Sequence, residues 1–157
     1  MKITFLAVGQ TDSVEIERLT AEYEKRLRRF VDFAREELPD IKNSKNLSEA
    51  EQKNREGRDI LARIKPTDRL VLLDERGKAY SSPEFADHLQ KNMNAGTKHL
   101  VFVVGGPYGF SQEVYHRADG LISLSRMTFS HQMIRLFFTE QLYRAFAIIH
   151  RLPYHHA

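Results

Sequence analysis

The chain has 157 residues, of which 41% are hydrophobic and 29% are charged, with a formal net charge of +3 and no cysteine. This length predicts one domain, residues 1–157, large enough to bury a core. The missing cysteines exclude disulfides and thiolate metal sites and are typical of a reducing compartment, so we expect a cytoplasmic protein. The apolar run at residues 3–8 is too short for a secretory leader, and no run approaches the roughly 18 apolar residues of a membrane span.

The first third of the chain predicts a strand, a helix and a second strand. The largely apolar residues 2–8 predict a buried strand. Asp12 with Glu15 indicates a helix start, and an apolar stripe at helical spacing follows it. Residues 31–38 predict the second strand, and the polar residues 40–47 predict a surface loop.

The middle of the chain continues this alternation. Ser48 and Glu51 form a capping box for a charged helix that is expected to stop before the next proline. Residues 69–73 predict a third strand, and residues 74–78 predict the turn that ends it. Residues 82–96 then predict a helix with a proline in its first turn and a glycine at its end.

The last third contains two more strands and the longest helix. Residues 99–104 predict a fourth strand, and Ser111 is a suitable cap for a short helix after it. Residues 121–124 predict a short fifth strand. Ser130 is a candidate cap for an amphipathic helix that must end before Pro153.

Strands that alternate with helices predict an α/β fold with a mainly parallel sheet flanked by helices. In such sheets ligands bind beyond the carboxyl ends of the strands. Three segments follow predicted strands in this way: Leu73 with Asp74, residues 105–109 and residues 125–129. We therefore expect these segments to converge on a ligand.

The segment after the fourth strand is GGPYG, and it is neither a Walker A loop nor a GxGxxG motif. Gly105 and Gly106 lack side chains and could offer main-chain groups to a ligand edge, while Pro107 restricts the backbone. A plain strand-to-helix turn explains the same residues. Both interpretations remain open at this point.

The segment SRMTF, residues 125–129, separates the fifth strand from the last helix. Its backbone could hydrogen-bond an adenine-like edge. Leu124, Met127 and Phe129 would then supply an apolar slot around the ring. The alternative is that Met127 and Phe129 belong to the core.

One side of the last helix is polar, with His131, Arg135, Glu140, Tyr143 and Arg144 opposite a dense apolar stripe. This side is either a solvated surface or a binding wall. From residue 116 onward the chain has arginines and no lysine, which favours bidentate contacts to phosphate or carboxylate. The arginines are Arg117, Arg126, Arg135, Arg144 and Arg151.

The tail LPYHH either frays or provides groups for chemistry. An aromatic ring and a histidine after a proline could stack on a base and abstract a proton. A metal site is not expected, because the histidines of this region have no accompanying carboxylate cluster and no HExxH motif occurs. The absence of GxSxG and of cysteine argues against a nucleophilic triad.

Taken together, the motifs resemble the ribosomal RNA large subunit methyltransferase H family. These are small bacterial enzymes of the SPOUT class that methylate N3 of a pseudouridine in 23S rRNA. The similarity spans the whole chain and is carried by several segments together: KITFLAVG, AEYEKRL, LLDERGK, VFVVGGPYGF, LSRMTFSHQMIRLFFTEQLYRAF and the closing PYHH. Tyr108 departs from the residues that some relatives have there, and His156 extends beyond the usual PYH end.

The resemblance implies a SPOUT-type fold with a C-terminal trefoil knot, a homodimer and S-adenosyl-L-methionine as the cofactor. Its target would be pseudouridine 1915 of 23S rRNA in the assembled ribosome. The implied cofactor contacts are Leu73, Gly105, Leu124, Ser125, Arg126, Met127, Thr128 and Phe129. The implied substrate side comprises His131, Arg135, Glu140, Tyr143, Arg144, Tyr154 and His155.

In this hypothesis His155 removes the proton from the imide nitrogen, and His131 is the alternative base. Tyr154 stacks or hydrogen-bonds, and Arg144 stabilises negative charge on a neighbouring carbonyl oxygen. Two other classes compete: an RNA-binding protein of the same fold without catalysis, and a nucleotide hydrolase. The intact glycine pair argues against the first, and the lack of Walker or carboxylate–metal motifs argues against the second.

Overall fold

A computed structural model describes residues 1–156. Its five strands form one parallel sheet in the order β2-β1-β4-β3-β5, which confirms the predicted α/β class. The expected single domain extends to residue 157, which lies outside the described residues. The elements are β1 (Lys2–Val8), α1 (Val14–Leu27), β2 (Asp32–Leu38), a 3₁₀ turn (Ser44–Asn46), α2 (Glu49–Ala62), β3 (Arg69–Ala79), α3 (Ser82–Asn94), β4 (His99–Val104), α4 (Gln112–Arg117), β5 (Gly120–Ser123) and α5 (Met133–Ile149).

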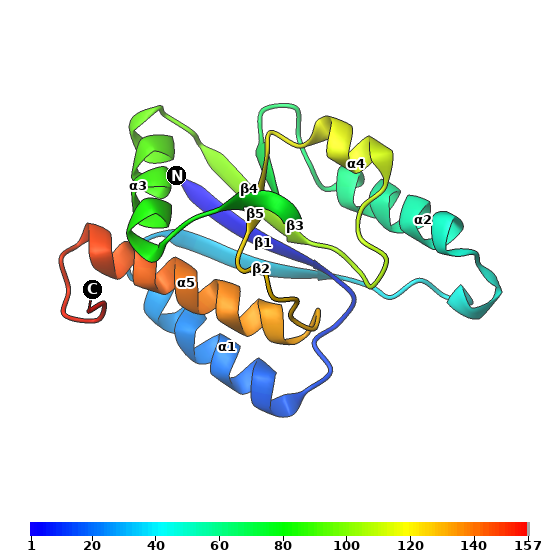
Figure 1. Cartoon of the computed structure of the whole chain (residues 1–157), viewed down its shortest axis with the longest axis horizontal. Helices are drawn as coiled ribbons and strands as arrows, with labels where there is room; N and C mark the ends of the chain where they lie inside the picture. Colours follow the sequence, from blue (N-terminus) through cyan, green and yellow to red (C-terminus); the bar gives the residue numbers. More distant parts are fainter. Residues whose placement is uncertain (157) are drawn as a thin grey trace.

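Helices cover both faces of the sheet, with α1, α3 and α5 on one face and α2 and α4 on the other (Figure 1). Because neighbouring residues of a strand point to opposite faces, both faces of each central strand need apolar side chains. Phe5 on β1 belongs to the first core, and the next residue, Leu6, belongs to the second. This explains why the central strands are continuous apolar runs.

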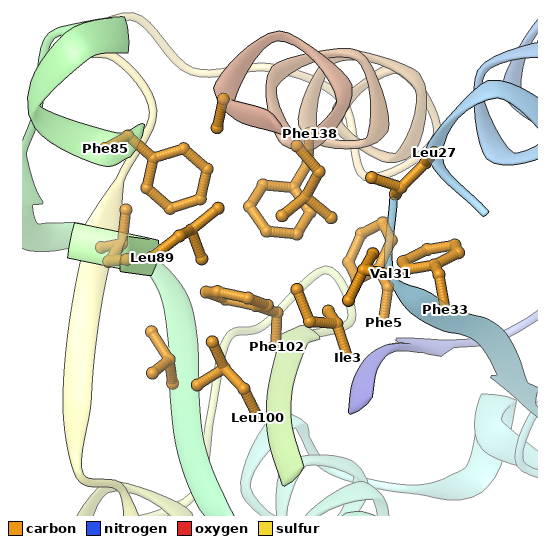
Figure 2. Packing of buried hydrophobic residues seen from close by; sticks show 14 of the residues in the cluster. Ile3, Phe5, Leu27, Val31, Phe33, Phe85, Leu89, Leu100, Phe102 and Phe138 are labelled. Atoms are coloured by element: carbon orange, nitrogen blue, oxygen red, sulfur yellow. The ribbon is translucent and has the colours of Figure 1, made fainter. Parts of the chain in front are cut away.

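The core under α5 is aromatic (Figure 2). Phe138 of α5 packs edge-on against Phe5 of β1 and Phe102 of β4, with ring centroids 4.8 and 4.9 Å apart. Burying each such ring contributes roughly 1.5–3 kcal/mol. This packing holds the first half of α5 across the carboxyl half of the sheet and so places the residues before α5 at that edge.

Helix starts follow the expected capping chemistry with small shifts. The Ser48 hydroxyl accepts the N–H of Glu51 at 3.1 Å, and Ser111 caps α4 as expected. Helix α1 is capped by Ser13 and not by Asp12. The Ser130 hydroxyl accepts the N–H of Met133 at 3.1 Å, although the regular part of α5 begins only at Met133.

The third strand differs from its prediction, because residues 74–78 do not form a terminal turn. The pairing with β5 shifts between Leu73 and Lys78, which both align with Ile122, and the strand continues to Ala79. Glycine at position 77 lets the chain pair with β5 again after the shift, since a Cβ there would lie 2.5 Å from the main-chain nitrogen of Ile122. Residues 74–77 therefore form an irregularity within β3, beside the loops expected to bind a ligand.

Candidate active site

The carboxyl ends of β3, β4 and β5 surround a cleft of about 980 Å³, a size usual for small-molecule sites. Leu73 of β3, Gly105 after β4 and the loop after β5 meet in it. All residues expected at the cofactor line this cleft except Arg126, which is exposed outside it. The convergence expected from the strand ends is therefore present in the fold.

The loop after β5 also borders a second hollow of about 400 Å³, between α3, β5 and α5. Leu124 and Phe129 line both spaces. Glu140, expected on the substrate side, lines this second hollow. Leu124 and Phe129 therefore stand between the cleft and the second hollow.

The glycine loop is a tight turn whose backbone forms one wall of the cleft. Gly109 has a φ of 80°, and its N–H donates to the carbonyl oxygen of Gly106 at 3.2 Å. A Cβ on Gly105 would lie 3.2 Å from the ring of Phe110, so a side chain there would crowd the loop. The interpretations as a turn and as a ligand wall are compatible.

Two serines hold the loop after β5 in shape. The Ser123 hydroxyl donates to the carbonyl oxygen of Ser125, and the Ser125 hydroxyl accepts the N–H of Met127, each at 2.9 Å. Within residues 1–156, the main-chain groups of Thr128 and Phe129 form no backbone hydrogen bond. These groups are open to a ligand edge, as recognition of an adenine-like ring requires.

Asp74 lines the cleft as expected, and two polar residues that were not predicted there, Arg76 and Tyr115, contact it. The Asp74 carboxylate accepts a short hydrogen bond from the Tyr115 hydroxyl and the N–H of Arg76 at 2.8 Å. The Arg76 guanidinium lies 4.6 Å from the centre of the Tyr115 ring. Burial opposes the charged form of Asp74, but the hydrogen bonds from Tyr115 and Arg76 and the charge of Arg76 together outweigh it and lower the pKa of Asp74. The cleft therefore has a fixed carboxylate next to the glycine wall.

The C-terminal tail packs on the last turns of α5 and on α1. The Tyr154 hydroxyl donates to Glu140 at 2.8 Å, and its ring packs edge-on against Tyr143 with centroids 4.7 Å apart. Arg144 donates to Glu140 at 2.6 Å and lies 4.8 Å from the centre of the Tyr154 ring. Burial and the hydrogen bonds with Tyr23 and Glu140 raise the pKa of Tyr154, so its hydroxyl stays a donor.

His155 is held by Arg144 through one ring nitrogen. The Arg144 guanidinium lies 3.1 Å from Nδ1 of His155. Because arginine only donates, Nδ1 is the acceptor, and the neutral ring carries its proton on Nε2. In this arrangement His155 presents an N–H donor, and Arg144 must move before Nδ1 can take a proton.

His131 has a different setting. It lines the cleft, is exposed, and its ring makes no hydrogen bond to any of the described residues. It lies just before α5, close to the helix N-terminus. A ring nitrogen without a partner is available to a ligand in the cleft.

The C-terminal tail follows the last turn of α5, whereas the loop that precedes the first turn of α5 lines the cleft (Figure 1). Arg144 follows Met133 by about three helical turns, which is about 16 Å along the axis. The structure thus brings Arg144, Tyr154 and His155 together, with Glu140 and Tyr143, but away from His131. One protomer in this conformation does not bring both histidines to one reacting atom.

Arg135 is not on the substrate side, contrary to the sequence-based expectation. Its side chain is fully buried and donates to the carbonyl oxygens of Gly9 and Val8 at 2.9 Å each and to Glu37 at 2.8 Å. It also donates to the carbonyl oxygen of His131 at 3.0 Å. Its donors bind α5 to the β1–α1 loop, which leaves them unavailable to phosphate.

The other arginines of the C-terminal half differ in exposure. Arg117 donates to the carbonyl oxygens of Lys65 and Asp68, at 2.9 and 2.8 Å, and so stabilises a turn. Arg126 and Arg151 are exposed. Within residues 1–156 no cluster of side chains could hold a metal ion, and no helix has the length and apolar character needed to cross a membrane.

Comparison with known proteins gives a consistent result. The family model described as "Predicted SPOUT methyltransferase" matches residues 1–155. A protein of Flavobacterium psychrophilum named "Ribosomal RNA large subunit methyltransferase H" is 58% identical over 156 residues, which is 99% of each chain. Proteins of the same name from Porphyromonas gingivalis and Bacteroides thetaiotaomicron are 57% and 53% identical, again over 99% of both chains.

Among solved structures, the SpoU methyltransferase AviRb from Streptomyces viridochromogenes, in complex with AdoMet, aligns with 96% of this chain and 61% of its own. This likeness is distant, with 12% identity and a TM-score of 0.43. The full-length relatives and the family model by themselves show the family. The chain belongs to the SPOUT methyltransferase family, among the ribosomal RNA large subunit methyltransferases H.

Proposed function

We propose that this protein methylates N3 of a pseudouridine of 23S rRNA, at position 1915, in the assembled ribosome. As a SPOUT methyltransferase it uses S-adenosyl-L-methionine. We base the choice of site chiefly on one observation. Three strand-end loops meet in one cleft, and one of them presents free main-chain groups beside apolar side chains.

The lining of the cleft suits this cofactor. When bound, S-adenosyl-L-methionine supplies a sulfonium methyl group, so the transfer requires no metal. Main-chain groups of residues 124–129 would hold the adenine edge, and Leu73 and Leu124 would supply apolar contacts to the ring. Gly105 forms the wall on the other side of the slot. Alignment of the methyl group with the attacking nitrogen is the larger part of catalysis in this proposal.

A homodimer completes the site, because within one chain the cleft lies beside the start of α5, whereas Arg144, Tyr154 and His155 lie together toward its end. Four apolar side chains next to the cleft are exposed, and Met127 is 79% exposed. They are Met127, Phe129, Met133 and Phe137. A second copy that covers them could place its tail over the cleft of the first. The C-terminal trefoil knot implied by the resemblance also belongs to this proposal.

The tail residues act on the substrate base in this arrangement. Tyr154 stacks on the base, and Arg144 donates to a carbonyl oxygen that gains negative charge as the imide loses its proton. His155 accepts that proton only after Arg144 has turned from Nδ1 to the substrate. His131 is the alternative acceptor, since its ring is free and lines the cleft.

Exposed Arg126 and Arg151 contact phosphates, so RNA affinity falls as salt concentration rises. One small domain offers few such contacts, which favours a shaped ribosomal surface over a free RNA loop as the substrate.

Transfer of a tritiated methyl group to ribosomes that lack this modification tests the proposal. We expect incorporation into 23S rRNA, mapped to one pseudouridine, and much weaker labelling of naked rRNA. Labelling at another nucleotide would overturn the target. Equal labelling of naked rRNA would overturn the ribosomal context.

A further inference from the structure

Behind the glycine wall of the cleft lies an acidic residue that the proposed chemistry does not use. Glu56, on α2, is only 5% exposed. Its Oε1 accepts a hydrogen bond from the side chain of Gln52 at 3.0 Å. Its Oε2 is buried and has no hydrogen-bond partner within residues 1–156. A buried acceptor without a partner is costly, so it requires an explanation.

The Glu56 carboxyl group packs directly against Gly106. A Cβ on Gly106 would lie 2.5 Å from Oε2 and 2.9 Å from Oε1 of Glu56. The backbone of Gly106 does not itself require glycine, because its φ lies outside the left-handed region, unlike that of Gly109 at 80°. The carboxyl group of Glu56 is therefore what excludes a side chain at position 106.

The surroundings of Glu56 favour its neutral form. Burial raises the pKa of Glu56, and the charges of Asp40 and Asp59 act in the same direction. The Gln52 hydrogen bond and the charge of His131 act against the shift. A carboxylate formed here would have to regain water, and the wall that buries it is the Gly106 loop.

We propose that Glu56 is a positioning residue for the cofactor. Its carboxyl group supports the Gly105–Gly106 wall in the closed position, and loss of its proton releases that wall. The inference rests on the proposed use of the cleft for S-adenosyl-L-methionine. It adds an acid on α2 that sets the shape of the slot without touching the cofactor.

The sign of the pH effect follows from the neutral form being the one buried. Cofactor affinity is highest when Glu56 is protonated and falls as the pH rises through its pKa, by up to about tenfold per pH unit. Glu56→Gln keeps the shape and cannot ionise. We expect it to bind S-adenosyl-L-methionine as the wild type does at low pH, without the decline at higher pH.

His131 also lines the cleft and its charge acts on Glu56, so His131→Gln serves as the matched control. Isothermal titration calorimetry of wild type and both variants from pH 5 to pH 8 tests the idea. The inference predicts a flat profile for Glu56→Gln and a retained decline for His131→Gln. A decline of equal size in Glu56→Gln, or a flat wild-type profile, overturns it.

A size exchange tests the contact independently of pH. Gly106→Ala should weaken cofactor binding at least about tenfold, because the new methyl group meets the carboxyl group. The double variant Glu56→Ala with Gly106→Ala should regain part of this affinity, since the new methyl group then fills part of the space that the supporting carboxyl group leaves. Gly120→Ala is the control glycine, because a Cβ there meets nothing within 4 Å.

Cofactor binding by Gly106→Ala as tight as that of the wild type, or no recovery in a folded double variant, would overturn the inference. Thermal unfolding of each variant shows whether it is folded. All these readouts measure cofactor binding alone, so they remain interpretable if the RNA target proves to be different. A wild-type protein that binds no S-adenosyl-L-methionine would instead refute the cofactor cleft itself.

Discussion

Replacing Arg135 with methionine distinguishes a structural role from a role in RNA binding. The side chain is fully buried, and its ion pair with Glu37 measures 2.8 Å. Removing one partner of a buried pair costs about 3–5 kcal/mol, and the lower limit applies here because Glu37 keeps its hydrogen bond from the Thr11 N–H at 2.7 Å. The carbonyl oxygens of Gly9 and Val8 also lose a donor. We therefore expect Arg135→Met to lose at least about 3 kcal/mol, a large part of the 5–15 kcal/mol typical of a domain.

Urea unfolding at one fixed protein concentration measures this loss. With a slope of about 2 kcal/mol per molar urea, the midpoint should fall by roughly 1.5–2.5 M. Lys91→Met is the control, because Lys91 and Asp87 form a pair on the surface, with side chains 74% and 60% exposed. That variant should lose less than about 1 kcal/mol. Loss of RNA affinity by Arg135→Met with an unchanged midpoint would refute the buried role and restore the phosphate contact.

Three further changes test other parts of the structure. Gly77→Ala should destabilise the protein by about 1–3 kcal/mol, because its Cβ would meet the main chain of β5 at 2.5 Å; an unchanged thermal midpoint would contradict this packing. Tyr154→Phe removes the hydroxyl that donates to Glu140. It should slow methyl transfer about tenfold with cofactor affinity unchanged, since such a hydrogen bond contributes about 1.5 kcal/mol. Single-turnover rates equal to those of the wild type would show that the hydroxyl has no role in the transfer. Burial works against ionisation of Glu37, but the hydrogen bonds from Thr11 and the charges of Arg35 and Arg135 together outweigh it and lower the pKa of Glu37 below 4.5. Its contribution is therefore present above that value and lost as the pH falls through the lower folded pKa, so urea midpoints of wild type should fall more steeply below pH 5 than those of Glu37→Gln.

The contact between Arg144 and His155 bears directly on which histidine accepts the proton in the proposed reaction. Arg144 occupies the nitrogen of His155 that would have to accept the proton. The sequence placed both residues on the substrate side, but it contained no information on which ring nitrogen is engaged. That depends on how the tail folds back over the last turns of α5. A comparison of His155→Ala with His131→Ala under single-turnover conditions identifies the acceptor.

Local patterns in the sequence were sufficient for the fold class and for the position of the cleft. Continuous apolar runs identify strands buried on both faces, and alternation with helices requires parallel pairing. Since parallel strands end at the same edge, Leu73, Gly105 and residues 124–129 had to lie near one another. The structure brings them to one cleft. The residue patterns of the strand ends and of the last helix also carried the family resemblance, which is confirmed.

Only the tertiary structure decided what each polar side chain contacts. Periodicity places Arg135 on a helix face but does not show that the β1–α1 loop covers that face, so a buried arginine was taken for a phosphate ligand. The continuation of β3 past residue 73 depends on the approach of Gly77 to β5, and this approach brings Asp74 and Arg76 into the cleft. Glu56 resembles any charged residue of a solvated helix until Gly106 packs on it. These contacts join residues far apart in the chain, and local sequence patterns report only on neighbours.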